Sequence, residues 1–143
     1  MENVLTPEIH HIVEYPGVAK RVKALITDGF ILILLMILFS SLFDQFENVA
    51  QEVRIFVFVF VFFLYDPLLT SFTGATLGHR LFGLRVRDEQ EPTKKISFFK
   101  AIIRFLIKGF LGWVSLLTVQ GNEKRKAMHD MAVGSVVVEV GSV

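Results

Sequence analysis

Two aspartates lie inside otherwise apolar stretches of this chain. Asp28 falls within residues 24–42, which hold one charge in nineteen positions, and Asp66 falls within residues 55–72, which hold one charge in eighteen. An ionised carboxylate is costly in hydrocarbon, so acids in such places are paired, protonated or functional. Two chemistries are therefore open: ion pairs that fix helix packing, or binding of a proton or a monovalent cation.

Oxygen atoms close to both acids favour the binding chemistry. Pro67 removes an N–H group and disturbs the preceding helical turn, which frees a backbone carbonyl. Thr27 and Thr70 add hydroxyl oxygens, and clusters of oxygen ligands suit a hard cation or a proton. The predicted ion- or proton-binding residues are Asp28 and Asp66, with Thr27 and Thr70 as additional ligands.

Two arginines are the predicted charge partners of these acids. Arg21 lies seven positions before Asp28 and therefore on nearly the same face of a helix. Arg104 lies in a later apolar segment. If the acids serve only packing, the expected pairs are Arg21 with Asp28 and Arg104 with Asp66.

The elements that carry the two acids are predicted to be membrane-spanning helices at residues 24–42 and 55–72. At 1.5 Å per residue each crosses roughly 30 Å of hydrocarbon. The hydrophobic fraction of 52%, with 15 Phe against 2 Tyr and 1 Trp, exceeds what a soluble core of this size needs. Because consecutive spanning helices run antiparallel, both acids are expected at similar depth in the cytoplasmic half of the membrane.

A third apolar segment, residues 98–119, is long enough to span but carries charges on one face. Lys100, Arg104 and Lys108 recur every four residues, which makes the first half amphipathic. Such a face suits a membrane surface. The charges favour an interfacial or re-entrant helix, while the length also permits a third spanning helix.

The distribution of charge predicts the orientation. Lys20, Arg21 and Lys23 precede the first helix, acids dominate the loop between the helices, and basic residues follow the second helix. By the positive-inside rule the N-terminus is cytoplasmic, in the inner membrane of a cell. The polar segment 1–19, the loop 73–97 and the tail 120–143 then lie in the cytoplasm, and segment 1–19 lacks the apolar core of a signal peptide.

Residues 83–90 and 135–140 have the alternation or β-branching of strands. If they pair, they form a small cytoplasmic β element. The predicted fold is thus an all-α membrane protein over residues 20–140, with two spanning helices, a third amphipathic, re-entrant or spanning helix, and this β element.

Other chemistries find little support. The absence of cysteine excludes disulfides and thiolate sites. The glycine-rich stretch after residue 73 lacks the spacing of a phosphate loop. The adjacent residues His10 and His11 would point in different directions on a helix, so they do not easily share a metal ion. His129-Asp130 lacks the further ligands of an HD-type metal site. We therefore expect no enzyme activity, metal or cofactor.

Basic residues after the second helix are expected to contact anionic lipid headgroups. Nucleic acid is not an expected partner, because acids at positions 88, 89 and 91 interrupt the basic patch. The residues of the predicted headgroup contact are His79, Arg80, Arg85 and Arg87.

The landmarks together resemble the RDD family of integral membrane proteins, which is named for one Arg and two Asp. The resemblance rests on Arg21, Asp28 and Asp66, on GATLGHRLFGLRV at 74–86, and on KRKAMHDMAVGSVVVEV at 124–140. It implies a bacterial-type protein with three transmembrane helices, an essential triad of Arg21, Asp28 and Asp66, and, for some members, sodium/proton exchange. One departure is His79, where the family often has Lys.

Two functions are expected from these observations. The first is a cation/proton exchanger that uses the paired intramembrane aspartates, in a homo-oligomer because two or three helices do not enclose a pathway alone. The alternative is a non-transporting membrane scaffold or accessory subunit that binds partner proteins or anionic lipids.

Overall fold

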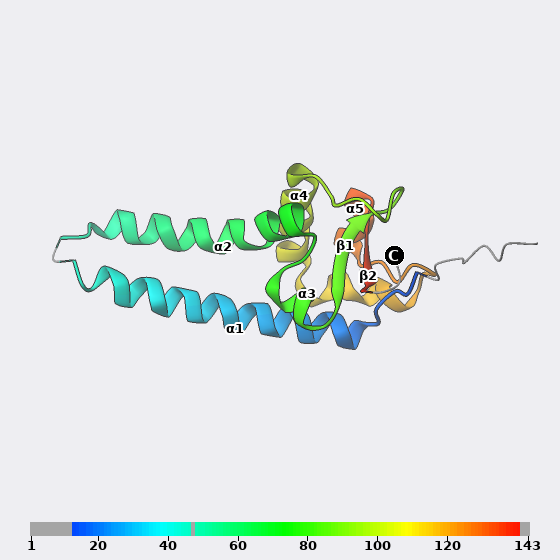
Figure 1. Ribbon diagram of the computed structural model, residues 1–143, viewed down its shortest axis with the longest axis horizontal. Coiled ribbons are helices and arrows are strands. Elements are labelled where there is room, and N and C mark those ends of the chain that lie inside the picture. Colours follow the sequence, from blue (N-terminus) through cyan, green and yellow to red (C-terminus); the bar gives the residue numbers. More distant parts are fainter. Residues whose placement is uncertain (1–12, 47, 141–143) are drawn as a thin grey trace, which may run out of the picture.

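The computed structural model describes residues 13–46 and 48–140. Residues 1–12 of the predicted N-terminal segment, with His10 and His11, lie outside the described residues. Figure 1 shows a long hairpin of two helices, with all other elements gathered at one end of it. The elements in chain order are α1 Val18–Phe43, α2 Gln51–Thr73, α3 Leu77–Leu81, β1 Leu84–Asp88, α4 Phe98–Leu111, the 3₁₀ helix η1 Gly112–Gln120, α5 Met128–Val133 and β2 Ser135–Glu139.

The hairpin is formed by α1 and α2, which extend the predicted helices 24–42 and 55–72 at both ends. Their apolar side chains are turned outward: Phe30 is 69% exposed, Leu34 66% and Phe56 67%. Both helices are long and apolar enough to cross a membrane. A surface of this kind is stable in hydrocarbon and not in water, which confirms the prediction of a membrane protein.

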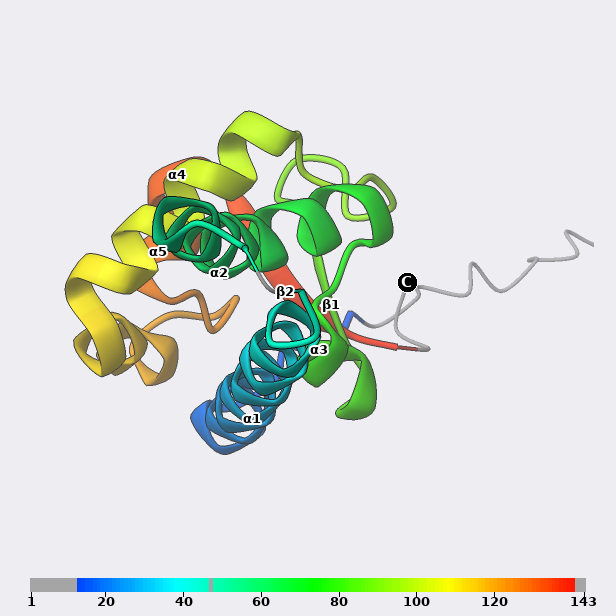
Figure 2. The same cartoon turned by 90° about the vertical axis from the view of Figure 1, so that its left-hand side faces the viewer.

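The second helix changes direction near Pro67. In Figure 2 the first part of α2 is seen end-on, while its last turns run across the view. Pro67 lies inside the helix, where its ring and its missing N–H kink the backbone. Gly74 then ends α2 with a positive φ of 78°, a conformation that favours glycine.

The third apolar segment is divided into two helical parts. The α-helix α4 ends at Leu111, and Gly112, with φ of 52°, begins the 3₁₀ helix η1. By length and composition residues 98–120 are a third candidate membrane span. In Figures 1 and 2, however, α4 lies across the end of the hairpin and not along it. This direction is the one expected of the interfacial or re-entrant alternative.

The two predicted strands pair. β1 and β2 form an antiparallel two-stranded sheet in which Leu84 faces Glu139, Val86 faces Val137 and Asp88 faces Ser135. The inward side chains alternate along β1, as a half-buried strand requires. The small β element predicted from residues 83–90 and 135–140 is confirmed.

The buried core lies between this sheet and the ends of two helices. Leu84, Val86 and Val137 pack against Ala24 of α1 and Ala101 of α4, all fully buried. The sheet therefore holds the beginning of α1 close to α4, and this contact positions the polar side chains of both helices.

Candidate functional site

A chain of buried ion pairs connects four elements at the end of the hairpin. Asp130 of α5 lies between two arginines: its Oδ2 is 2.6 Å from Nη1 of Arg21 in α1, and its Oδ1 is 2.9 Å from Nε of Arg104 in α4. All three side chains are at most 5% exposed. Arg21 also donates from Nη2 to the carbonyl of Arg125 at 2.6 Å.

Asp130 is ionised in this position. Burial alone would raise the pKa of its carboxyl, but the positive charges of Arg104 and Arg21 outweigh that effect and hold the pKa far below its usual range. Its Oδ2 also accepts from the backbone N–H of Ala127, which closes the first turn of α5. Asp130 therefore ties α1, α4 and α5 together.

The same chain continues to Asp66 of α2. Its Oδ2 accepts from Nζ of Lys108 at 2.7 Å, and its Oδ1 lies 3.5 Å from Nη1 of Arg104 and accepts from the Thr70 hydroxyl at 3.0 Å. Asp66 is 4% exposed. Its negative charge is thus neutralised by two cations of α4.

Asp28 is held in a different way. It accepts three hydrogen bonds from uncharged donors: the hydroxyl of Tyr65 at 2.7 Å, the hydroxyl of Thr76 at 2.6 Å and the backbone N–H of Gly78 at 2.7 Å. Among the described residues, the nearest basic nitrogen in an ion-pair geometry is Nδ1 of His79, at 4.0 Å. Asp28 is therefore a carboxylate solvated by neutral dipoles and not by a cation.

The hydroxyl of Thr76 joins Asp28 to His79. Thr76 Oγ1 is within hydrogen-bond distance of both Asp28 Oδ2 and His79 Nδ1, and also accepts from the backbone N–H of His79. A hydroxyl has one hydrogen to donate. When Thr76 donates to Asp28, Nδ1 of His79 must carry a proton and donate to Thr76, which leaves Nε2 of His79 without one.

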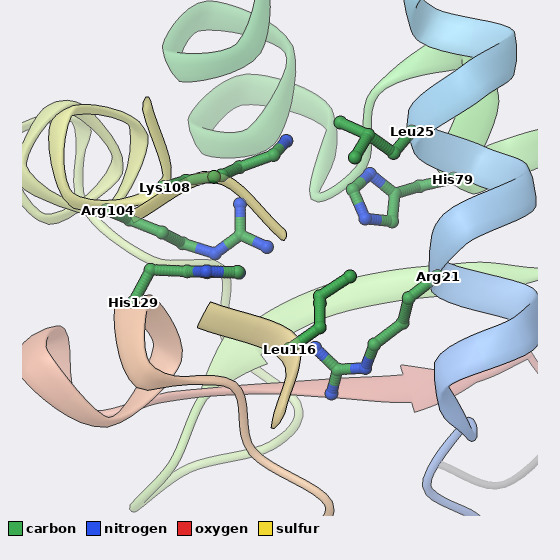
Figure 3. Close-up of a pocket in the computed structure, with 8 residues that line it drawn as sticks. Arg21, Leu25, His79, Arg104, Lys108, Leu116 and His129 are labelled. Carbon is green, nitrogen blue, oxygen red and sulfur yellow. The ribbon is translucent and has the colours of Figure 1, made fainter. Parts of the chain in front are cut away.

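Two hollows meet around these groups. A groove of about 560 Å³ opens between α1, α2 and α4, and both Asp28 and Asp66 line it together with mostly apolar side chains. A smaller cavity of about 30 Å³ lies on the other side, where Arg21, Arg104, Lys108, His79 and His129 line it (Figure 3). Asp28 faces the groove, and the Thr76–His79 pair leads from it to the cavity.

Several predicted site residues are placed differently from the sequence expectation. Arg21 pairs with Asp130 and not with Asp28, because seven residues of helix separate their Cα atoms by about 10 Å. Asp28 and Asp66 line one groove, but no hydrogen bond joins them in the described part of the chain. Thr70 bonds Asp66, whereas Thr27 donates to the carbonyl of Lys23.

The four residues predicted to contact lipid headgroups differ in their exposure. Arg80 is exposed and Arg85 and Arg87 are partly exposed, so they are accessible to a membrane surface. His79 is not, because it is 6% exposed and lines the cavity. The expected contact of His79 with a lipid headgroup was wrong, since the short helix α3 turns this side chain toward α1.

Sequence reasoning missed Asp130, Lys108 and Tyr65 as members of the site. Charge counting offered one signal: three cations, Lys100, Arg104 and Lys108, lie within the three apolar segments, against two acids, Asp28 and Asp66. At least one acid from outside these segments was therefore needed for balance. Among residues 13–46 and 48–140 no group of three or more His, Asp or Glu side chains is placed to hold a metal ion.

Comparison with known proteins identifies the family. A family model described as the RDD family matches residues 15–134, which is most of the chain. The chain belongs to the RDD family. No curated protein and no solved structure matches it. Arg21, Asp28 and Asp66, the three residues that the resemblance to this family singled out, are all buried, although no single contact joins them.

The two histidines of the RDD network predict an acid-sensitive fold. Burial, with the charge of Arg104, lowers the pKa of His79 to about 3, and the same effects outweigh the nearby Asp130 and lower that of His129 to about 3. Below pH 6.5 the unfolded chain binds protons that the folded chain does not, so stability falls as pH falls toward 3.

We expect the free energy of unfolding to decrease by up to about 1.4 kcal/mol per pH unit for each histidine below pH 6.5. Thermal unfolding in detergent between pH 7.5 and 5 measures this slope. His129→Gln should reduce the slope, and His79→Asn should do so independently. A slope that persists unchanged in both variants contradicts the assignment, because Asp88 and Glu89 titrate only at lower pH.

Proposed function

We propose that this RDD protein is a cation/proton exchanger in which Asp28 binds the proton and the cation in turn. The observation that carries the proposal is the neutral surroundings of Asp28. A carboxylate paired with arginine holds its charge permanently, whereas one that accepts from Tyr65, Thr76 and Gly78 has no fixed counter-charge to displace. An intramembrane carboxylate of this kind is suited to exchange.

The hydrogen bonds from Asp28 to His79 supply a route for the proton. A proton that reaches Nε2 of His79 allows Nδ1 to pass its own proton to Thr76 Oγ1, and Thr76 passes its hydroxyl proton to Asp28. His79 returns to the neutral state as the other tautomer, and Asp28 becomes neutral. The total charge is conserved at each step, because the positive charge of the incoming proton cancels the negative charge of Asp28.

The groove supplies a route for the cation. Asp28, Tyr65 and Asp66 line it together with mostly apolar side chains of α1, α2 and α4. In this proposal Asp66 becomes a second cation ligand only when Lys108 releases it. Lys108 therefore separates a closed, ion-paired form from a form that holds the cation.

The exchanger is oriented in the membrane and assembled with other copies of the chain. The end of the hairpin that carries the network faces the cytoplasm of a cell with an inner membrane, in keeping with the basic residues near it. A homo-oligomer, packed through the exposed Phe-rich face of α2, completes the pathway. Monovalent cation and proton are the transported partners.

The test is proton movement in vesicles that contain the purified protein. An imposed sodium or potassium gradient should drive proton movement that a pH-sensitive dye records. Asp28→Asn should reduce the rate to that of protein-free vesicles. Asp44→Asn is the matched control, because Asp44 is an exposed acid at the far end of the hairpin and should leave the rate unchanged. Equal rates for Asp28→Asn and the native protein sink the proposal.

The scaffold alternative is favoured by a specific observation, the chain of ion pairs from Lys108 through Asp66, Arg104 and Asp130 to Arg21. Such a chain fixes helix positions without any transport. If native vesicles show no cation-driven proton movement, while the exposed face around Arg80 retains a partner protein or vesicles of anionic lipid, the scaffold replaces the exchanger.

A further inference from the structure

The cavity beside the ion-pair chain is lined by cations and histidines. Arg21, Arg104 and Lys108 reach it from α1 and α4, and His79 and His129 from α3 and α5. Figure 3 shows the guanidinium of Arg104 and the ring of His79 pointing into the space between these elements. None of the described residues that line the cavity is an acid.

Two guanidinium nitrogens at this place make no hydrogen bond within the described part of the chain. They are Nε of Arg21 and Nη1 of Arg104, and both are buried. Nη1 of Arg104 lies 3.5 Å from Asp66 Oδ1, an ion-pair contact that does not satisfy hydrogen-bond geometry. The residues themselves are 5% and 1% exposed. A buried charged donor without an acceptor is destabilising, because it has lost its hydrogen bonds to water. Two such donors in one cavity therefore indicate a ligand that accepts hydrogen bonds.

The two histidines add no positive charge to the cavity. The Nδ1 of His129 is 2.6 Å from the Ser115 hydroxyl, and its Nε2 is 3.6 Å from Asp130 Oδ1, so a proton on Nε2 is the favoured tautomer and faces Asp130. Thr76 donates its one hydrogen to Asp28, which leaves Nε2 of His79 without a proton. The donors available to a ligand in the cavity are therefore those of the basic side chains.

The size and charge of the cavity suit a small anion. Its volume of about 30 Å³ exceeds the roughly 10–15 Å³ that holds one water molecule, so a monatomic halide fits. A cation is excluded by the charge of the lining.

We propose that the cavity between Arg21, Arg104 and His79 is a binding site for a small monatomic anion of the halide class. The anion accepts from the free N–H groups of Arg21 and Arg104 and lies close to the ammonium of Lys108. It offsets the mutual repulsion of these three cations, whose own acids, Asp66 and Asp130, lie outside the cavity lining. The site does not depend on the exchange chemistry of Asp28.

The first test uses the native protein in detergent at constant pH. With N-methyl-D-glucamine as the only cation, gluconate is replaced by chloride or bromide at fixed ionic strength. We expect a saturable rise in the unfolding temperature of about 3 °C or more with either halide. Gluconate is too large for the cavity and controls for screening. Equal unfolding temperatures in gluconate and halide overturn the proposal.

The second test fills the cavity without touching its charges. Leu116 lines the cavity, and Leu116→Phe should remove the halide-dependent rise. Leu117→Phe is the matched control, because Leu117 is 66% exposed and outside the lining, and it should keep the rise. A halide response that survives Leu116→Phe at full size contradicts the site.

A direct measurement keeps the proposal open to refutation if Leu116→Phe does not fold. Crystals of the native protein grown in bromide should show an anomalous peak within hydrogen-bond distance of Arg104 Nη1 and Arg21 Nε. Ordinary water density there, without an anomalous signal, overturns the proposal. Because no sodium or potassium is present in the stability assay, its outcome is separate from that of the exchange assay.

Discussion

Replacing Asp130 with Asn is expected to lower the free energy of unfolding by about 3–5 kcal/mol. The substitution removes the one negative charge between Arg21 and Arg104 and leaves both guanidinium groups buried beside each other. Breaking one partner of a buried pair costs far more than the pair contributes, because the remaining charge has no solvent. The amide retains the size of the carboxyl, so the loss is electrostatic.

Unfolding of the purified protein in detergent, followed by circular dichroism against denaturant, measures this loss. Glu91→Gln is the control, because Glu91 also accepts from a cation, Lys94, but in a pair that is exposed at the surface. Surface pairs contribute about 0–1 kcal/mol. A loss for Asp130→Asn no larger than that of the control would contradict the central position of Asp130.

The hairpin was predictable because its signal is local. A run of eighteen or more apolar residues is long enough to span a membrane whatever surrounds it, and both α1 and α2 follow this rule. The pairing of β1 with β2 was predictable for a related reason, since both segments have the β-branched, alternating pattern of strands. The start of α1 at Val18 was less predictable, because residues 18–23 include the cations Lys20, Arg21 and Lys23 and lie outside the apolar run.

The partners of the site residues were not predictable, because they depend on tertiary contacts between distant segments. Arg21 and Asp130 are 109 positions apart, and no periodicity reports such a contact. Asp28 was identified as buried, but one of its donors, Tyr65, comes from α2 and the others come from the loop and short helix that follow Gly74. The charged residues of the apolar segments can be identified from the sequence, but their partners cannot.

For the third apolar segment, length and charge favour different positions relative to the membrane. Hydropathy over residues 98–120 alone favours a third span. Arg104 and Lys108, however, are the partners of Asp130 and Asp66, so α4 must lie where both cations reach these acids. Its position across the end of the hairpin follows from those two ion pairs and from the break at Gly112.

Gly78→Ala is expected to lower the free energy of unfolding by about 1–3 kcal/mol, as overpacking does. A Cβ at this position would meet the backbone carbonyl of Ala24, and it would lie 2.7 Å from the carboxyl carbon of Asp28. The carbonyl belongs to the rigid helix α1, so α3 must move away. That movement draws the Gly78 N–H from Asp28 Oδ1 and separates Thr76 from Oδ2.

Gly29→Ala provides a control of opposite sign. Gly29 is adjacent to Asp28 in α1, and a Cβ there meets nothing within 4 Å. An alanine in a helix interior is favoured over glycine by about 1 kcal/mol, so this variant should be more stable than the native protein. Unfolding in detergent compares the two, and cation-driven proton movement should be lost in Gly78→Ala alone. Equal stability changes would show that the close approach of α3 to α1 does not hold Asp28 in place.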